Sequence, residues 1–72
     1  MRPTYSEPVL GGALHGINHI VEDTKQVIVE TMDGEQVYAQ MEFVREENRS
    51  LSLYVDLRRY PGVQLRITLF SE

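Results

Sequence analysis

The stretch LSLYVDLRRYPGVQLRITLF, residues 51–70, alternates between apolar and other side chains in two nearly strict runs. The apolar positions are Leu51, Leu53, Val55 and Leu57, followed by Val63, Leu65, Ile67 and Leu69. A period of two is typical of a strand that has one face on a core and the other face toward water. We therefore expect two antiparallel strands, over residues 49–58 and 63–70.

The segment between these strands, Tyr60-Pro61-Gly62, has the composition of a tight turn. A three-residue loop there pairs Val55 with Ile67 and sets Asp56 opposite Arg66, which is a favourable cross-strand pair. A proline at the second central position of a tight turn fits poorly with a trans bond. A cis Tyr60–Pro61 bond is therefore the less favoured alternative to a trans one.

The same period continues toward the N-terminus through residues 24–31 and 35–45. Between them, a three-residue loop closed by Gly34 in the left-handed conformation pairs Val29 with Val37 and keeps the apolar residues on one face. A two-residue Asp-Gly loop would pair Val29 with Tyr38 and split the apolar residues between faces. We therefore predict the three-residue loop.

The corner between residues 35–45 and 49–58 contains Glu46, Glu47 and Asn48. Asparagine tolerates the left-handed conformation better than most residues, so Asn48 can close a three-residue loop that pairs Phe43 with Leu51. The four predicted strands then form one antiparallel meander.

Residues 14–23, LHGINHIVED, are left to cover the apolar face of this sheet. Their β-branched residues and Gly16 favour a strand, which would help to close an SH3-like barrel, with one short helix as the alternative. The sequence thus predicts a single all-β domain over residues 14–72. We expect a small antiparallel meander of four to five strands, as an SH3-like barrel or a half-open sheet. Residues 1–13 lack periodicity and contain prolines and glycines, so we expect a flexible N-terminal arm there.

The size and the charge of the chain limit the classes of function that it can serve. It has 72 residues, a net charge of −4 and no cysteine. Such a domain buries only ~60% of the surface of its unfolded chain, so its apolar residues are needed for the core and little room is left for a deep catalytic pocket. The sequence contains neither a transmembrane-length apolar run nor a signal peptide, and a cytoplasmic location is expected.

No catalytic motif or nucleotide-binding motif occurs in the sequence, so we expect no enzyme activity and no cofactor. His15 and His19 are four residues apart, with Glu22 close by. A helix would place these three side chains on one face, where they could bind zinc. The spacing lacks the HExxH pattern of a hydrolytic site, and we expect ordinary polar residues and no metal site.

Apolar and aromatic side chains occupy several outward positions of the predicted strands, and a few more lie in the arm. The outward residues are Ile28, Tyr38, Tyr54 and Phe70, and those of the arm are Tyr5, Val9 and Leu10. Exposed aromatic residues on a sheet face are typical of a contact surface, unless the arm or residues 14–23 cover them. An arm with apolar residues can dock on a partner as an extended peptide. These seven residues are the predicted partner-binding residues.

We therefore expect a non-catalytic protein–protein interaction module that acts as a small accessory or regulatory factor on a larger complex. The small size of the chain is also typical of phage-type proteins that regulate a host machine such as RNA polymerase, and such a role is one candidate for it. Pairing of an exposed edge strand would also allow a homodimer. The alternative function is a single-stranded nucleic-acid-binding β-barrel domain, in which bases stack on Tyr54, Arg58, Tyr60 and Arg66. The negative net charge disfavours nucleic acid as a partner, and no membrane is expected as one.

Overall fold

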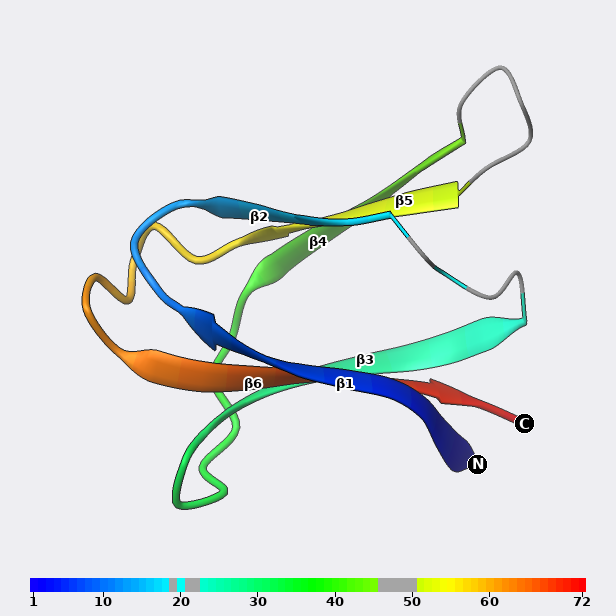
Figure 1. Ribbon diagram of the computed structural model, residues 1–72, viewed down its shortest axis with the longest axis horizontal. Coiled ribbons are helices and arrows are strands. Elements are labelled where there is room, and N and C mark those ends of the chain that lie inside the picture. The colour runs from blue at the N-terminus through cyan, green and yellow to red at the C-terminus, as the bar shows by residue number, and fades with distance from the viewer. Residues whose placement is uncertain (19, 21–22, 46–50) are drawn as a thin grey trace.

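In the part of the chain that the computed structural model describes, six strands form two antiparallel sheets that face each other (Figure 1). The structure describes residues 1–18, 20, 23–45 and 51–72. Sheet A contains, in spatial order, β1 (Arg2–Leu10), β6 (Gln64–Ser71) and β3 (Thr24–Thr31), and sheet B contains β2 (Leu14–Ile17), β5 (Leu51–Asp56) and β4 (Gln40–Arg45). The described residues include no helix, and the all-β prediction is confirmed. The prediction of four to five strands is wrong in number, and the sheets do not close into a barrel.

The core lies between the two sheets and is built mainly from their central strands. Leu65, Ile67 and Leu69 of β6 are fully buried, and so are Leu53 and Val55 of β5. These side chains belong to one cluster, which also includes Ile17, Val29, Ala39 and Leu57. Burial of each large apolar side chain contributes about 1.5–3 kcal/mol. The alternation seen in residues 51–70 therefore identified the centre of both sheets.

The predicted hairpin between residues 49–58 and 63–70 is wrong, because β5 and β6 lie in different sheets. Val55 does not pair with Ile67, and Asp56 does not pair with Arg66. A single meander would leave the apolar faces of both strands without cover. In the structure, each of these two apolar strands covers the other from the opposite layer. The Tyr60–Pro61 bond is trans.

The predicted loop at residues 32–34 is confirmed, but the second strand of that hairpin is much shorter than expected. Gly34 has a φ of 88°, and the Val37 N–H donates to the Val29 carbonyl at 2.9 Å. After Val37 the chain leaves sheet A, and β4 begins in sheet B at Gln40. The predicted strand 35–45 therefore divides between a short hairpin in one layer and an edge strand in the other.

β4 pairs with β5 in a register shifted by two residues from the predicted one. Phe43 lies opposite Leu53, whereas the prediction placed it opposite Leu51. A shift of two keeps every side chain on its predicted face. The loop predicted at residues 46–48, with Asn48 in the left-handed conformation, lies outside the described residues.

The expectation of a flexible arm over residues 1–13 differs from the structure, in which β1 pairs with β6 along most of its length. Pro3 and Pro8 had indicated a loop. They fit in β1 because it is an edge strand, where a missing N–H does not interrupt the sheet. Of residues 14–23, which were predicted as strand or helix, 14–17 form the strand β2.

The corners β1–β2 and β5–β6 cross between the layers side by side, as Figure 1 shows at the left of the molecule. The Gly11 N–H donates to the Val63 carbonyl at 2.8 Å, and the Gly62 N–H donates to the Gly11 carbonyl at 3.1 Å. The Gly12 N–H donates to the Leu57 carbonyl at 2.9 Å. The first two bonds continue the β1–β6 pairing around the bend, and the third ties the same corner to the residue that follows β5.

Candidate functional site

Three of the predicted contact residues share the outer face of sheet A. In the strand pairing, Leu10 lies opposite Gln64, Ile28 opposite Thr68 and Phe70 opposite Gln26. The β6 positions alternate with the buried residues of that strand, and the residues opposite them on β1 and β3 lie on the same face, so these side chains point away from the core. Leu10 lies at one end of this face, and Ile28 and Phe70 lie toward the other end.

A polar group separates the two ends of this face. Arg66, at the centre of β6, lies opposite Pro8 on β1 and Glu30 on β3. Its guanidinium Nη1 donates to Ser6 Oγ at 3.0 Å, and Ser6 Oγ is 3.2 Å from Thr68 Oγ1. The predicted apolar contact residues therefore do not form one continuous patch.

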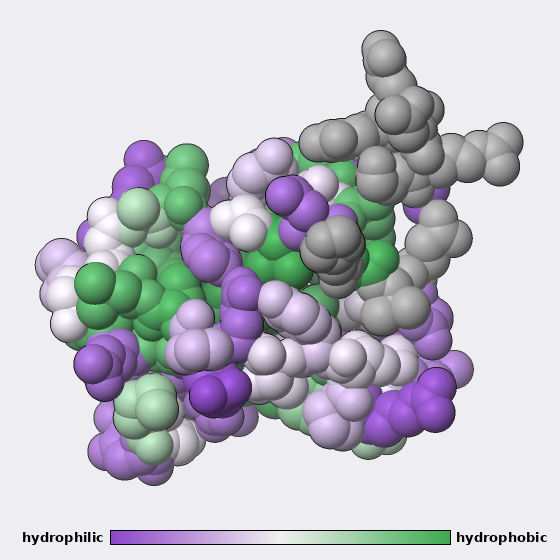
Figure 2. All heavy atoms as spheres, in the orientation of Figure 1, coloured by the Kyte–Doolittle hydropathy of each residue, from purple (hydrophilic) through white to green (hydrophobic). Residues whose placement is uncertain are grey.

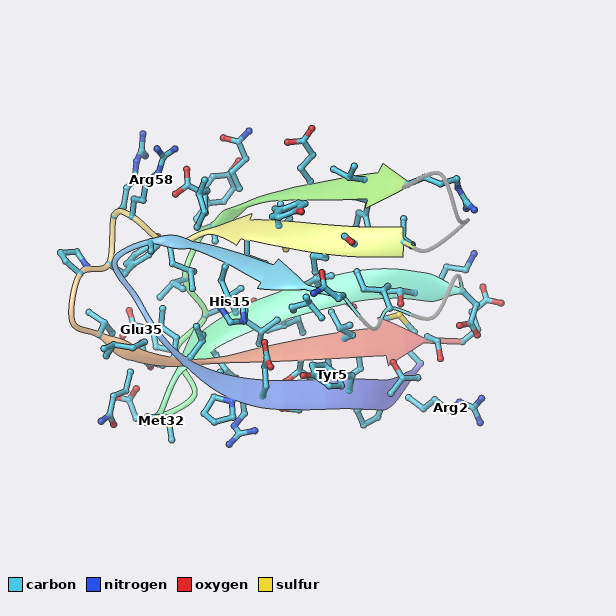
Figure 3. All side chains as sticks on the ribbon, turned by 45° about the horizontal axis from the view of Figure 1, so that its top comes forward. Arg2, Tyr5, His15, Met32, Glu35 and Arg58 are labelled. Atoms are coloured by element: carbon cyan, nitrogen blue, oxygen red, sulfur yellow. The ribbon has the colours of Figure 1, made fainter. Side chains whose placement is uncertain are left out.

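An open groove of about 440 Å³ lies at the Leu10 end of sheet A, and it is lined by Pro8, Val9, Leu10, Met32, Gln64 and Leu65. We call it the Leu10–Met32 groove. Leu10 is 65% exposed and Met32 is 61% exposed, although both are large apolar side chains. Figure 2 shows hydrophobic residues gathered over the end of β1 and the start of β6. Figure 3 shows Met32 at the same end of the molecule, beyond the outer side of sheet A.

The hairpin turn after β3 holds Met32 at the groove in a constrained backbone. The Gly34 N–H donates to the Thr31 carbonyl at 3.0 Å, and the Thr31 N–H donates to the Glu35 carbonyl at 2.8 Å. Thr31 Oγ1 accepts from the Glu35 N–H at 3.1 Å and donates to the Asp33 carboxylate. The Thr31 hydroxyl is the main reason why the pKa of Asp33 lies below its ordinary value. The rim of the groove is therefore negatively charged next to Met32.

Sequence reasoning identified Leu10 and Val9 but missed Met32. The available signal was an unusual one, a large apolar residue at the first position of a turn that ends in Asp-Gly. Turn positions are normally polar, and an apolar side chain there cannot reach the core. β1 and β3 both pair with β6, and this arrangement brings Leu10 and Met32 to one groove. No local pattern in the sequence shows that the two strands have the same neighbour.

Tyr5 and Val9 point into the space between the sheets, and not outward as docking residues. Both pack against the core cluster, and they lie opposite the buried residues Leu69 and Leu65. Between them on the same face of β1 stands Glu7, which receives a hydrogen bond from Tyr5 Oη at 2.6 Å. The other carboxylate oxygen of Glu7 accepts a hydrogen bond from His15 Nε2 on β2. Glu7 and His15 thus link an edge of sheet A to an edge of sheet B.

The pKa values in this cluster follow from its contacts. Partial burial pushes the pKa of Glu7 upward, but the hydrogen bonds from Tyr5 and His15, together with the charge on His15, outweigh it. The pKa of Glu7 therefore lies below its ordinary value. The hydrogen bond to Glu7, followed by burial and the charge of Glu7, raises the pKa of Tyr5. Each polar group has a partner within the cluster, which makes it a structural link between the layers.

Tyr38 and Tyr54 lie on the sheet B side of the molecule, away from the outer face of sheet A. The ring of Tyr54 lies over Gly16, since a Cβ on that glycine would be 3.3 Å from Tyr54 Cε1. Tyr54 borders a hollow of about 220 Å³, and Tyr38 borders a separate one of about 120 Å³. Both hollows are also lined by Gln40 and Asp56, so the two tyrosines flank the same part of the sheet.

The four residues of the predicted nucleic-acid surface do not all come together. Arg66 lies on sheet A, whereas Tyr54 and Arg58 border one hollow on sheet B. Arg58 binds Asp56 through two nitrogens, with distances of 3.0 Å and 2.9 Å. This contact is the largest cause that lowers the pKa of Asp56 to about 2, and the backbone N–H of Arg58 and the charge of Arg59 lower it further. Tyr60 is half-buried against the core, and its hydroxyl donates to the Tyr38 carbonyl.

Among the described residues, no group of three or more His, Asp or Glu side chains is placed to hold a metal ion. His15 binds Glu7, whereas His19 and Glu22 lie outside the described residues. Within the same part of the chain, no helix is long and apolar enough to cross a membrane. Comparisons with protein-family models, with curated proteins and with solved structures find no match for this chain.

Proposed function

We propose that this chain is a non-catalytic protein-interaction module that binds its partner through the Leu10–Met32 groove. The observation that carries this proposal is the pair of large apolar side chains, Leu10 and Met32, which stand more than half exposed on the walls of one groove. Exposed apolar side chains that line a concave surface are typical of sites where a partner inserts an apolar side chain.

The groove is held in shape before any partner binds. The hydrogen bonds of the turn restrain Met32, and the paired corner at Gly11 restrains Leu10. A surface that is already ordered loses little conformational entropy on binding, and its affinity is higher than that of a surface that must first become ordered. The restrained backbone on both sides of the groove therefore supports a role of the groove in recognition.

The charges around the groove indicate the chemistry of the partner. Asp33 and Glu35 lie exposed beside Met32, and the whole chain carries a net charge of −4. We therefore assign the groove to a segment of a larger protein that has an apolar or aromatic side chain flanked by Lys or Arg. Electrostatic complementarity of this kind mainly accelerates association and selects the partner.

A selection of random displayed peptides on the immobilised wild-type chain tests this proposal. We expect the enriched peptides to share an apolar or aromatic residue flanked by basic residues. Their affinity should fall at least tenfold for the double variant Leu10→Ser with Met32→Ser, since truncation of a central contact typically costs more than ~1 kcal/mol at each position. The affinity should be unchanged for Tyr54→Ala, the matched control on the other sheet.

The urea unfolding midpoints of both variants show whether the fold persists. Leu10 and Met32 are exposed, so we expect little change in stability from their substitution. Peptides that bind the folded groove variant as tightly as the wild type would refute the proposal. Enrichment of peptides without an apolar residue would refute it as well.

A further inference from the structure

The free edge of β4 differs from the other three sheet edges. β1 contains Pro3 and Pro8 and shifts register once, β3 shifts register beside Lys25, and β2 has only four residues. Prolines, bulges and short length are the usual devices that prevent an edge strand from pairing with another chain. β4 has no proline and pairs with β5 over six residues without a register shift. Among the described residues, no strand pairs with its other side.

The side chains along this edge are apolar on the inner face of sheet B. Met41 is 39% exposed and Phe43 is 46% exposed, whereas Val55 and Leu53, directly opposite them on β5, are fully buried. The core therefore continues to the edge of the sheet and ends there with two large apolar side chains only partly covered. An additional strand alongside β4 would cover both.

We propose that β4 pairs antiparallel with β4 of a second copy of this chain, with Phe43 opposite Phe43 at the two-fold axis. The two three-stranded B sheets then join into one sheet across the axis. In an isologous dimer the same strand serves on both sides, so an edge that accepts a strand also supplies one. This inference is independent of the groove on sheet A, because no residue of β4 lines that groove.

The charges and the length of β4 determine this register. Registers that keep the apolar side chains of both copies on one face place the axis at a residue, and those that overlap at least three residues of the strand place it at Met41, Glu42, Phe43 or Val44. An axis at Glu42 puts two carboxylates directly opposite each other, which is destabilising. An axis at Met41 overlaps only residues 40–42 of the strand, and an axis at Val44 overlaps only residues 43–45. An axis at Phe43 overlaps residues 41–45, pairs two aromatic rings and sets Glu42 opposite Val44 of the second copy.

The absence of cysteine from the chain makes the register directly measurable, because a single-cysteine variant has only one thiol. Directly opposite residues of an antiparallel pair have Cα atoms about 4.5–5.5 Å apart, within the range of a disulfide. Phe43→Cys should therefore form a covalent dimer on mild oxidation. In the same register, the two Glu42 positions are offset by about 7 Å along the strand, and the two Met41 positions by about 14 Å. Glu42→Cys and Met41→Cys should therefore remain monomeric under the same oxidation.

Sedimentation velocity over a concentration series tests the association without any cysteine. We expect the wild-type chain to approach twice its mass of 8.3 kDa as the concentration rises. The dissociation constant should increase at least tenfold for Phe43→Lys, whereas Tyr54→Ala, on β5, should leave it unchanged. The unfolding midpoint of Phe43→Lys, measured at low concentration, shows whether the monomer still folds.

Each of the other outcomes overturns the proposal. A wild-type chain that stays monomeric at millimolar concentration shows that β4 does not pair. A dimer that Phe43→Lys leaves intact shows that another surface makes the contact. A faster cross-link at Glu42→Cys or Met41→Cys shows that the proposed register is wrong.

Discussion

Replacement of Gly11 by alanine tests whether the two corners cross as closely as the structure shows. A Cβ on Gly11 would lie 2.0 Å from the carbonyl oxygen of Tyr60 and 3.0 Å from its carbonyl carbon. Cβ atoms essentially never approach a backbone oxygen so closely, and a backbone carbonyl cannot rotate away as a flexible side chain can. The corner must therefore open by more than about 1 Å to accept the methyl group.

The cost follows from the contacts that such an opening removes. The bond from the Gly11 N–H to the Val63 carbonyl and the bond from the Gly62 N–H to the Gly11 carbonyl would both be lost or stretched. Each contributes about 0.5–1.5 kcal/mol, and the loosened packing around Gly11 adds to this. We expect Gly11→Ala to lower the free energy of unfolding by about 2–4 kcal/mol. A domain of this size has a total of only about 4–11 kcal/mol.

Gly34→Ala is the matched control for this measurement. Gly34 has a φ of 88°, but no atom lies within 4 Å of the position of its Cβ. The control should therefore cost only the strain of a left-handed alanine, about 1–2 kcal/mol. Urea unfolding followed by circular dichroism measures both variants against the wild type. A loss below 1 kcal/mol for Gly11→Ala, or one smaller than that of the control, would refute the close crossing of the corners.

Two further predictions concern the carboxylates of Glu7 and Asp56. The pKa of Glu7 is lower in the folded chain than its unfolded value of about 4.3, so its carboxylate stabilises the fold above that pH and loses this effect as the pH falls through the folded value. The stability difference between the wild type and Glu7→Gln, measured by urea unfolding, should therefore be present at pH 7 and shrink as the pH falls below the unfolded pKa. A difference that stays constant with pH would argue against the Tyr5–Glu7–His15 cluster. For Asp56, the carboxyl ¹³C shift should titrate near pH 2 in the wild type and at a higher pH in Arg58→Ala, where the backbone N–H of residue 58 and the charge of Arg59 still act on the carboxylate. Equal midpoints would show that the Arg58 side chain does not bind Asp56 in solution.

The positions and faces of several strands were predictable because burial on one face leaves a local pattern in the sequence. β6 is the clearest case, since its residues alternate without interruption between buried and more exposed. The turn at Gly34 was predictable for a similar reason, because its conformation depends on the few residues of the loop itself. Neither prediction required knowledge of which strands become neighbours.

The pairing of the strands was not predictable in the same way. A hairpin between β5 and β6 and a crossing between two layers give the same alternation at Val55 and Ile67, because both residues are buried in either case. Which of these two arrangements forms depends on which apolar strand faces pack against each other, and this is a property of the whole chain. The same limit applies to Met32, which becomes part of a site only because β3 and β1 flank β6.

The N-terminal strand was missed for a more specific physical reason. Its inward positions are Tyr5, Glu7 and Val9, so a carboxylate interrupts the apolar pattern of the strand. Glu7 can occupy an inward position because Tyr5 and His15 both bind it, and His15 comes from the other sheet. A buried polar group with partners costs far less than one without, but its partners are not visible before the layers are assembled.

The placement of the two proposed contact regions has a consequence for how they would act together. The Leu10–Met32 groove lies on the outer face of sheet A, whereas the edge that carries Phe43 belongs to sheet B. Pairing of β4 between two copies therefore leaves both grooves uncovered, and one dimer would present two of them. Two linked grooves bind a partner with repeated sites more tightly than one groove does, without any new contact within a groove. Since different residues carry the two surfaces, the groove variant should still dimerise, and Phe43→Lys should still bind single peptides with unchanged affinity.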